Sequence, residues 1–175
     1  VGEMMRSLFL GLLLVPQESG EQEAARKKLK LAAGTEVMLW AADPHVQNPV
    51  AISIDEKGRI YVAECWRRHT STLDIHMRKE WLDDDLACRR HEDQVAYHVK
   101  RMGEKAKDWR VESERIRIVE DKAGKGRADS VVTFSDGYNE LCEGIGAGVL
   151  VRNGEVWYTC IPNLWYLKHN DGDGK

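Results

Sequence analysis

The stretch that decides the fold class of this chain is Val50-Ala51-Ile52-Ser53-Ile54-Asp55-Glu56-Lys57-Gly58-Arg59-Ile60-Tyr61-Val62-Ala63-Glu64. Two runs rich in β-branched residues flank Asp-Glu-Lys-Gly, which is a turn sequence. Gly58 suits the positive φ that a tight turn requires, because it has no Cβ. The stretch therefore predicts a β-hairpin formed by residues 50–55 and 59–64.

Similar patterns elsewhere predict further strands. Residues 35–41 alternate polar and apolar side chains, as a half-buried strand does. More strands are expected at 115–121, 130–134, 147–151, 155–161 and from 165 onward, with a second tight hairpin at Asn153-Gly154. The segments GRIYVAE (58–64) and GEVWYTC (154–160) share one pattern, which is typical of repeated propeller blades. We expect an all-β fold: about two blades of a truncated β-propeller of about six blades.

One region interrupts the β pattern. Apolar residues recur there every three to four positions, as in an amphipathic helix: Val95, Val99, Met102, Ala106 and Trp109. Three carboxylates, Asp83, Asp84 and Asp85, fall at its N-terminal side, where they favour the helix dipole; a catalytic acidic cluster is the alternative. We expect a helical insertion near residues 83–109. Because His76, His91 and His98 lack metal-binding spacing, we interpret them as surface or packing residues.

Composition limits the functions to consider. The chain has 175 residues, of which 42 % are hydrophobic and 31 % charged, so it is long enough for one globular core. Its formal net charge of -3 gives no reason to propose a nucleic-acid partner, because proteins that bind phosphate backbones normally show a clustered basic surplus. We divide the chain into residues 1–20, a polar linker at 21–34, and a partial propeller domain at 35–175.

The first residues resemble a targeting sequence. Met4-Met5-Arg6 precedes the apolar run Ser7-Leu8-Phe9-Leu10-Gly11-Leu12-Leu13-Leu14-Val15, and polar residues follow at once. A positive residue before a short apolar run is typical of a secretory signal peptide, and the run is too short to span a bilayer. The alternative is a buried N-terminal helix or strand. We expect export to the periplasm or the cell envelope.

The four cysteines, Cys65, Cys88, Cys142 and Cys160, are widely separated. The chain has no C-x-x-C pair, which excludes a zinc ribbon, a thioredoxin motif and an attached c-type haem within it. In an exported protein they form disulfides or remain buried free thiols. The spacing does not decide between these two states or indicate a pairing.

Two acidic glycine loops follow predicted strands, at 120–129 and 169–175. An Asp-x-Asp-Gly turn supplies the oxygen ligands that Ca²⁺ needs. The first loop has Ala123 and Lys125 at ligand positions, so we interpret it as a structural turn. The second keeps Asp171 and Asp173, with His169 in place of the first carboxylate. Asp171 and Asp173 are thus weak calcium-ligand candidates, and a plain turn is the alternative.

Glycines at Gly144, Gly146 and Gly148 look at first like a dinucleotide-binding loop. Such a loop must lie between a strand and a helix, whereas a hairpin is predicted to follow here. We therefore interpret these glycines as positions of close backbone packing at the entry of a strand.

Five segments together carry a family resemblance: NPVAISIDEKGRIYVAE (48–64), WLDDDLAC (81–88), ERIRIVED (114–121), GIGAGVL (144–150) and YTCIPNLWYLKHNDGDGK (158–175). They resemble the N-terminal propeller region of large bacterial proteins classed as membrane-bound dehydrogenases, which look like distant relatives of the quinoprotein glucose and sorbosone dehydrogenases. The resemblance implies export, association with the membrane, a pyrroloquinoline quinone cofactor, calcium, and electron transfer to a haem-bearing cytochrome domain outside this stretch.

The resemblance does not extend to the quinone-site residues. Quinoprotein sugar dehydrogenases often carry a His and an Arg where this chain has Val50 and Cys65. No catalytic or cofactor-binding residue is therefore identified. The expectation of dehydrogenase activity rests only on the resemblance to the family. Two hypotheses follow: an exported oxidoreductase acting on a sugar-like small molecule, or a non-catalytic propeller of the cell envelope that binds a carbohydrate or a protein. A cytosolic structural protein is a third.

Overall fold

A computed structural model describes residues 20–168 of the chain, which divides into two compact units, Val1–Leu39 and Trp40–Lys175. In the first unit, α1 spans Gly20–Lys27, and all of it except Gly20 falls within the predicted linker. Acidic residues occupy its first turn and basic residues its last, an order that favours the helix dipole. Among residues 20–168, no helix is both long and apolar enough to cross a bilayer. The predicted signal peptide lies, except for Gly20, outside the described residues.

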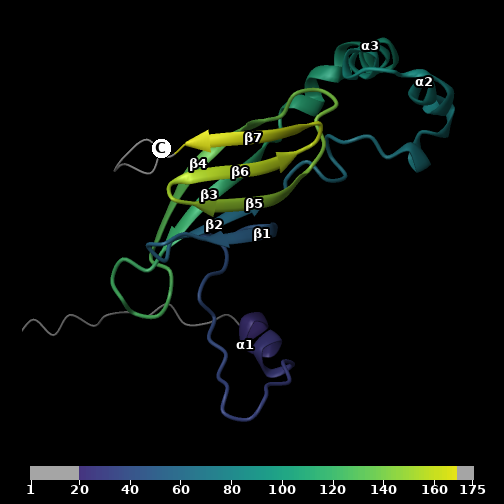
Figure 1. The fold of residues 1–175 in the computed structure, drawn as a ribbon. Coiled ribbons are helices and arrows are strands. Elements are labelled where there is room, and N and C mark those ends of the chain that lie inside the picture. The colour runs from purple at the N-terminus through teal and green to yellow at the C-terminus, as the bar shows by residue number, and fades with distance from the viewer. Residues whose placement is uncertain (1–19, 169–175) are drawn as a thin grey trace, which may run out of the picture. The chain divides into compact units, whose positions relative to one another are not determined.

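The second unit is built mainly from two open antiparallel sheets (Figure 1). The first sheet has the order β1-β2-β3-β4, with bounds Pro49–Ile54, Ile60–Glu64, Glu114–Glu120 and Ser130–Tyr138. The second has the order β5-β6-β7, with bounds Gly146–Arg152, Glu155–Cys160 and Asn163–Lys168. Consecutive strands are neighbours throughout, so each sheet is a meander. The predicted class, mostly β with a helical insertion, is confirmed.

Both predicted hairpins are present. In the first, the Asp55 carboxylate accepts the backbone N–H groups of Lys57 and Arg59, each at 2.9 Å, and Gly58 has φ +77°. In the second, Asn153 and Gly154 have φ of 52° and 76°, the left-handed pair that a two-residue turn between β5 and β6 requires. Turn chemistry thus fixes the register of both hairpins.

The main core lies between the two sheets. Alternate residues of the inner strands supply it: Tyr61, Ala63, Ile116, Ile118, Val156, Tyr158 and Cys160. Strands β1 and β5 also meet directly, because Ser53 Oγ accepts the backbone N–H of Val151 at 3.0 Å. The two sheets therefore stack face to face.

The predicted strand at residues 35–41 is wrong. Those residues form no ladder, although Trp40 O accepts the N–H of Ala128 at 2.8 Å. Trp40 and Ala41 instead pack against Val62 and Val119, on the face of the first sheet that points away from the second. Trp40 and Ala41, at the end of the predicted strand, are half-buried by this packing and not by pairing with another strand.

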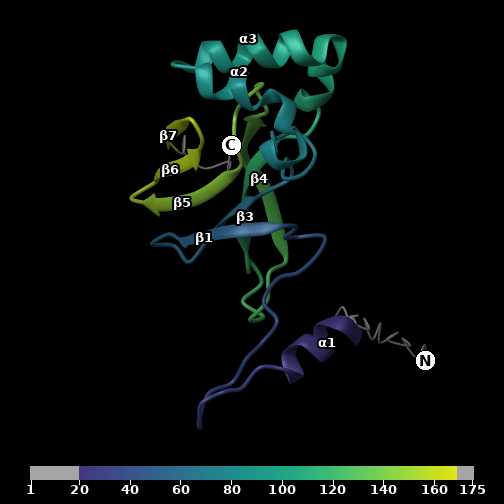
Figure 2. The ribbon, with the colours of Figure 1, turned by 90° about the vertical axis from the view of Figure 1, so that its right-hand side faces the viewer.

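The helical insertion is present but is not one continuous helix. It comprises η1 Ile75–Met77, η2 Lys79–Trp81, α2 Leu82–Ala87, α3 His91–Met102 and η3 Gly103–Arg110. The chain leaves α3 at Gly103, which has φ +56°. Val99, predicted to face the core, is 49 % exposed, whereas Tyr97 and His98 are buried. Helices α2 and α3 lie beyond one end of the strands, here called the helical end (Figure 2).

Candidate functional site

Four charged residues are buried at the helical end. Glu64, Arg67 and Glu114 are 0 % exposed and Glu143 is 5 % exposed. They come from the end of β2, the loop after it, the start of β3 and the loop after β4. Charged groups are rarely buried unless hydrogen bonds replace their hydration. Their partners therefore define how this end of the domain is built.

Glu114 binds main-chain N–H groups from the loop after β2 and from the second sheet. Its Oε1 accepts the N–H groups of Trp66 at 3.1 Å and Arg67 at 2.8 Å. Its Oε2 accepts the N–H of Gly146, the first residue of β5, at 3.3 Å. One carboxylate thus holds the loop after β2 against the start of the second sheet.

Arg67 has the complementary role for carbonyl groups. Its Nη1 donates to Glu143 O at 3.0 Å, and its Nη2 donates to the carbonyls of Ser71 at 3.1 Å, Glu140 at 3.0 Å and Trp109 at 3.3 Å. In the described part of the chain, no carboxylate forms an ion pair with this guanidinium. Its charge is therefore stabilised by oriented carbonyl dipoles.

Glu64 forms the neighbouring cluster. Its Oε2 accepts from Arg115 Nε at 2.7 Å and from Trp66 Nε1 at 3.3 Å, while Oε1 accepts the N–H of Gln47 at 2.8 Å. The Arg115 guanidinium also lies 4.5 Å from the centre of the Trp66 ring, which is a cation–π contact.

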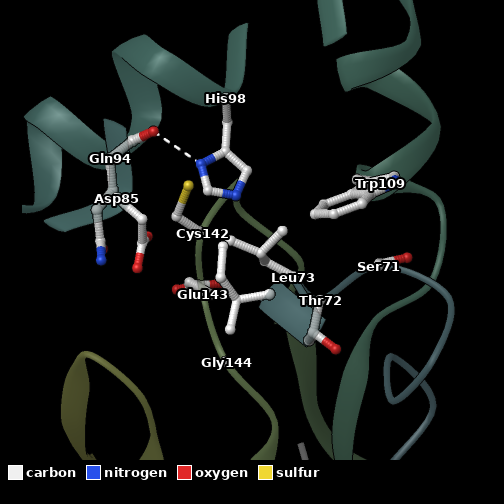
Figure 3. Close-up of a pocket in the computed structure, with 11 residues that line it drawn as sticks. Ser71, Thr72, Leu73, Asp85, Gln94, His98, Trp109, Cys142, Glu143 and Gly144 are labelled. Carbon is white, nitrogen blue, oxygen red and sulfur yellow. Dashed lines mark hydrogen bonds between the residues drawn. The ribbon is translucent and has the colours of Figure 1, made fainter. Parts of the chain in front are cut away.

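A cavity of about 320 Å³ lies between the helical insertion and the loop after β4 (Figure 3). We call it the helix–loop cavity. It is lined by Ser71, Thr72, Leu73, Ile75, Asp85, Gln94, His98, Trp109, Cys142, Glu143 and Gly144. Its volume is at the lower end of the range for small-molecule sites.

The lining combines aromatic, acidic and amide groups. Trp109 supplies an indole ring, Asp85 and Glu143 supply carboxylates, and Gln94 supplies an amide. Asp85 is fixed by the phenol of Tyr97, which donates to its Oδ1 at 2.7 Å. Glu143 is fixed by the N–H of Glu140, which donates to its Oε2 at 2.8 Å. The carboxylates are thus held in place before any ligand arrives.

His98 contributes a neutral imidazole. Its Nδ1 lies 2.9 Å from Gln94 O, and because a carbonyl only accepts, we assign the proton to Nδ1 and the lone pair to Nε2. The ring packs edge-on against Trp81 and Trp109, with centroids 5.7 and 5.9 Å apart. Burial lowers the pKa of His98. Figure 3 shows the second ring nitrogen turned toward the cavity.

The cysteines do not supply a reactive thiolate. All four are free thiols, with Cys65 and Cys160 buried. Burial raises the pKa of Cys142, which lines the cavity, to about 11 and that of Cys160 to about 12. Because the thiolate is the nucleophile, neither thiol is activated at neutral pH.

The first acidic loop is a structural turn, as interpreted. Asp121 accepts the N–H groups of Lys125 at 2.9 Å and Gly126 at 2.7 Å. Asp129 accepts those of Lys122 at 2.8 Å and Ala123 at 3.0 Å. Within residues 20–168, no group of three or more His, Cys, Asp or Glu side chains is arranged to hold a metal ion. The calcium candidates Asp171 and Asp173 lie outside the described residues.

Close packing explains the glycine at the entry of β5. A Cβ on Gly146 would lie 1.7 Å from Tyr158 Oη, far inside contact distance. The interpretation as a packing glycine is therefore confirmed.

Val50 and Cys65, which occupy the positions of the sugar dehydrogenase His and Arg, do not line the helix–loop cavity.

Sequence reasoning missed Arg67, Glu114, Glu143 and the cavity-facing role of His98. One signal was present for Glu114, because it lies two and four residues before Ile116 and Ile118 and so points to the same inner face. No sequence signal separates buried Arg67 from exposed Arg68. The partners of Arg67 are carbonyl groups, which every residue carries.

The fold and the site define a mostly antiparallel β domain in which a helical insertion and a loop line a small open cavity of mixed polar and apolar character. The family model described as a domain of unknown function, DUF7133, matches residues 21–175, so the chain belongs to this family. No curated protein matches the chain. No solved structure matches it.

Proposed function

We propose that this domain contributes blades to a β-propeller of an exported protein and binds a polyhydroxylated small molecule, such as a sugar, in the helix–loop cavity. The observation that carries the proposal is the lining, which places the Trp109 indole among fixed carboxylate and amide groups. An indole face suits the C–H face of a sugar ring. Paired carboxylate and amide groups suit its hydroxyls, which both donate and accept.

The propeller part of the proposal is supported by the repeated sheet order. The first three strands of one sheet correspond in order to the three strands of the other, and the equivalent strands β1 and β5 lie against each other. Both outward faces also carry exposed apolar residues: Val50, Ile52 and Ile54 on β1, and Leu150, Leu164 and Tyr166 on the second sheet. In a propeller, each sheet packs against a neighbour on both faces. Further sheets would cover these rows.

Binding of sugars tests the proposal directly. The complete gene product is titrated with glucose, galactose, xylose and their disaccharides in a calorimeter, beside the variants Trp109→Ala and Asp85→Asn. We expect saturable binding that both variants weaken at least about tenfold, because one removes the stacking surface and the other a charged acceptor. The matched control is Trp157→Ala, an aromatic truncation on the second sheet outside the cavity. Absence of binding, or equal loss in the control, would contradict the proposal.

An oxidoreductase is the second candidate, and the sequence resemblance favours it. Pyrroloquinoline quinone is a planar ring system bearing carboxylates, which cationic side chains would have to receive. The helix–loop cavity does not fit it, because its lining includes Asp85 and Glu143 but no Lys or Arg side chain, and the Arg67 guanidinium is occupied by carbonyls. A quinone would require another site.

Dye reduction distinguishes the two candidates. The complete gene product is incubated with pyrroloquinoline quinone and calcium and assayed with the same sugar panel. Turnover with any sugar supports the oxidoreductase, whereas sugar binding without turnover supports the non-catalytic domain. Fusion of residues 1–20 to a reporter tests export, and retention of that reporter in the cytosol would contradict it.

A further inference from the structure

Arg67 touches three separate walls of the helix–loop cavity. The carbonyls that its guanidinium binds belong to Ser71, Trp109 and Glu143, all of which line the cavity, and to Glu140, which neighbours it. These carbonyls come from the loop after β2, from η3 and from the loop after β4. A single side chain therefore holds three segments of the chain together, and the carbonyl farthest along the sequence, that of Glu143, lies 76 residues from Arg67.

The other described polar links between η3 and the loop after β4 are exposed. Arg110 pairs with Glu140, and Asn139 Nδ2 donates to Arg110 O at 2.6 Å, both on the surface. Exposed pairs contribute little to holding two segments together, because water competes for the same groups. The buried Arg67 contacts are shielded from that competition.

The geometry of the guanidinium cannot be replaced by another cation. Its planar fork holds Nη1 on the Glu143 carbonyl while Nη2, on the other side, shares its two N–H groups among the other three carbonyls. A Lys ammonium has three donors on one nitrogen and cannot span all four positions. A Met side chain leaves every carbonyl unpaired in a buried site.

We infer that Arg67 is a positioning residue of the helix–loop cavity: it fixes η3 and the loop after β4 at the spacing that a ligand requires. The ligand part of this inference rests on the proposed function, and the positioning part does not. An Arg that only stabilised the fold would affect all strands equally when it was changed. Replacement of a positioning residue loosens the cavity walls before it loosens the strands.

Amide hydrogen exchange separates these two roles without any ligand. The complete gene product is compared with Arg67→Lys and Arg67→Met. One control, Val156→Ala, lowers overall stability by truncating a fully buried residue between the sheets, away from the cavity. A second, Arg59→Lys, changes an arginine paired with Asp55 at the opposite end of β2. If Arg67→Met does not fold, Arg67→Lys decides.

We expect amides of residues 103–110 and 139–146 to exchange about tenfold faster in Arg67→Lys, and faster still in Arg67→Met, while amides of β2 and β3 stay protected. Neither control should show this local pattern. Exchange that rises evenly over all strands, or does not change, would overturn the inference.

A second arm uses the sugars of the binding assay. If the wild type binds one, Arg67→Lys should weaken it about tenfold or more while Arg59→Lys leaves it unchanged. Unchanged affinity in Arg67→Lys would overturn the inference even if the exchange pattern appeared. If the wild type binds no sugar, the proposed function fails, and the exchange pattern still supports or overturns the positioning role.

Discussion

The carboxylate of Glu114 accepts the backbone N–H of Arg67 at 2.8 Å, so these two fully buried charged residues meet through the main chain. Glu114 collects N–H groups and Arg67 collects carbonyl groups. Together they supply hydrogen-bond partners to main-chain N–H and C=O groups where loops leave the sheets. Strand pairing does not supply such partners in these loops. The buried charges are thus substitutes for secondary structure at the helical end.

Replacing the Glu114 carboxylate should destabilise the domain. In Glu114→Gln, the amide –NH₂ must face N–H donors from Trp66 and Arg67 or from Gly146, which leaves at least one donor unpaired. We expect the free energy of unfolding to fall by about 3 kcal/mol, measured by urea denaturation. The control Glu112→Gln changes an exposed residue and should be neutral. Equal stability of the two variants would show that Glu114 is not a structural acceptor.

A methyl group at Gly146 should be poorly tolerated. Because its Cβ would meet Tyr158 Oη at 1.7 Å, we expect Gly146→Ala to lower the free energy of unfolding by at least about 2 kcal/mol. The hydroxyl of Tyr158 is buried and has no hydrogen-bond partner among the described residues, so Tyr158→Phe alone should cost little. The double variant should recover part of the loss. No recovery in thermal melts would place the clash elsewhere.

The sequence predicted local features well and long-range ones poorly. The hairpins at Gly58 and at Asn153-Gly154 were predictable, because turn residues and strand pattern lie within a few positions of each other. The end of α3 at Gly103 is marked by a local signal, a glycine with positive φ, which the regular spacing of apolar residues across it concealed. The covering role of Trp40 depends on packing partners far along the chain. The cavity was not predictable either. Arg67 binds backbone carbonyls, and because every residue has one, the sequence does not show which residues Arg67 will contact.

Stability should depend on pH through His98. Burial lowers the pKa of His98 in the folded chain, although the hydrogen bond with Gln94 and, to a smaller extent, the charge of Asp85 act in the opposite direction. Below the unfolded-state pKa of about 6.5, the unfolded chain binds a proton that the folded chain does not, so the free energy of unfolding falls as pH drops. The loss is complete once pH passes the folded-state pKa.

The variant His98→Gln isolates this contribution. Its free energy of unfolding, measured by urea denaturation between pH 7.5 and 5, should fall less steeply than that of the wild type. His76→Gln changes an exposed histidine and should retain the wild-type slope. Parallel curves for His98→Gln and the wild type would refute a buried neutral imidazole.

Any calcium bound by this chain should depend on the second acidic loop. We expect weak binding, with a Kd of roughly 1 mM, that is lost in the double variant Asp171→Asn and Asp173→Asn. Asp121→Asn should leave calcium binding unchanged, because the Asp121 carboxylate is already occupied by backbone N–H groups. Calorimetric titration with CaCl₂ measures both. Loss of binding in Asp121→Asn would instead assign calcium to the first loop.

The apolar row of Val50, Ile52 and Ile54 has a practical consequence for handling the protein. These side chains are 47 to 61 % exposed on β1, an edge strand whose free backbone groups also invite pairing. A domain that presents both features tends to self-associate and to precipitate when concentrated. Colloidal behaviour, rather than folding, should therefore limit work on residues 40–168 alone.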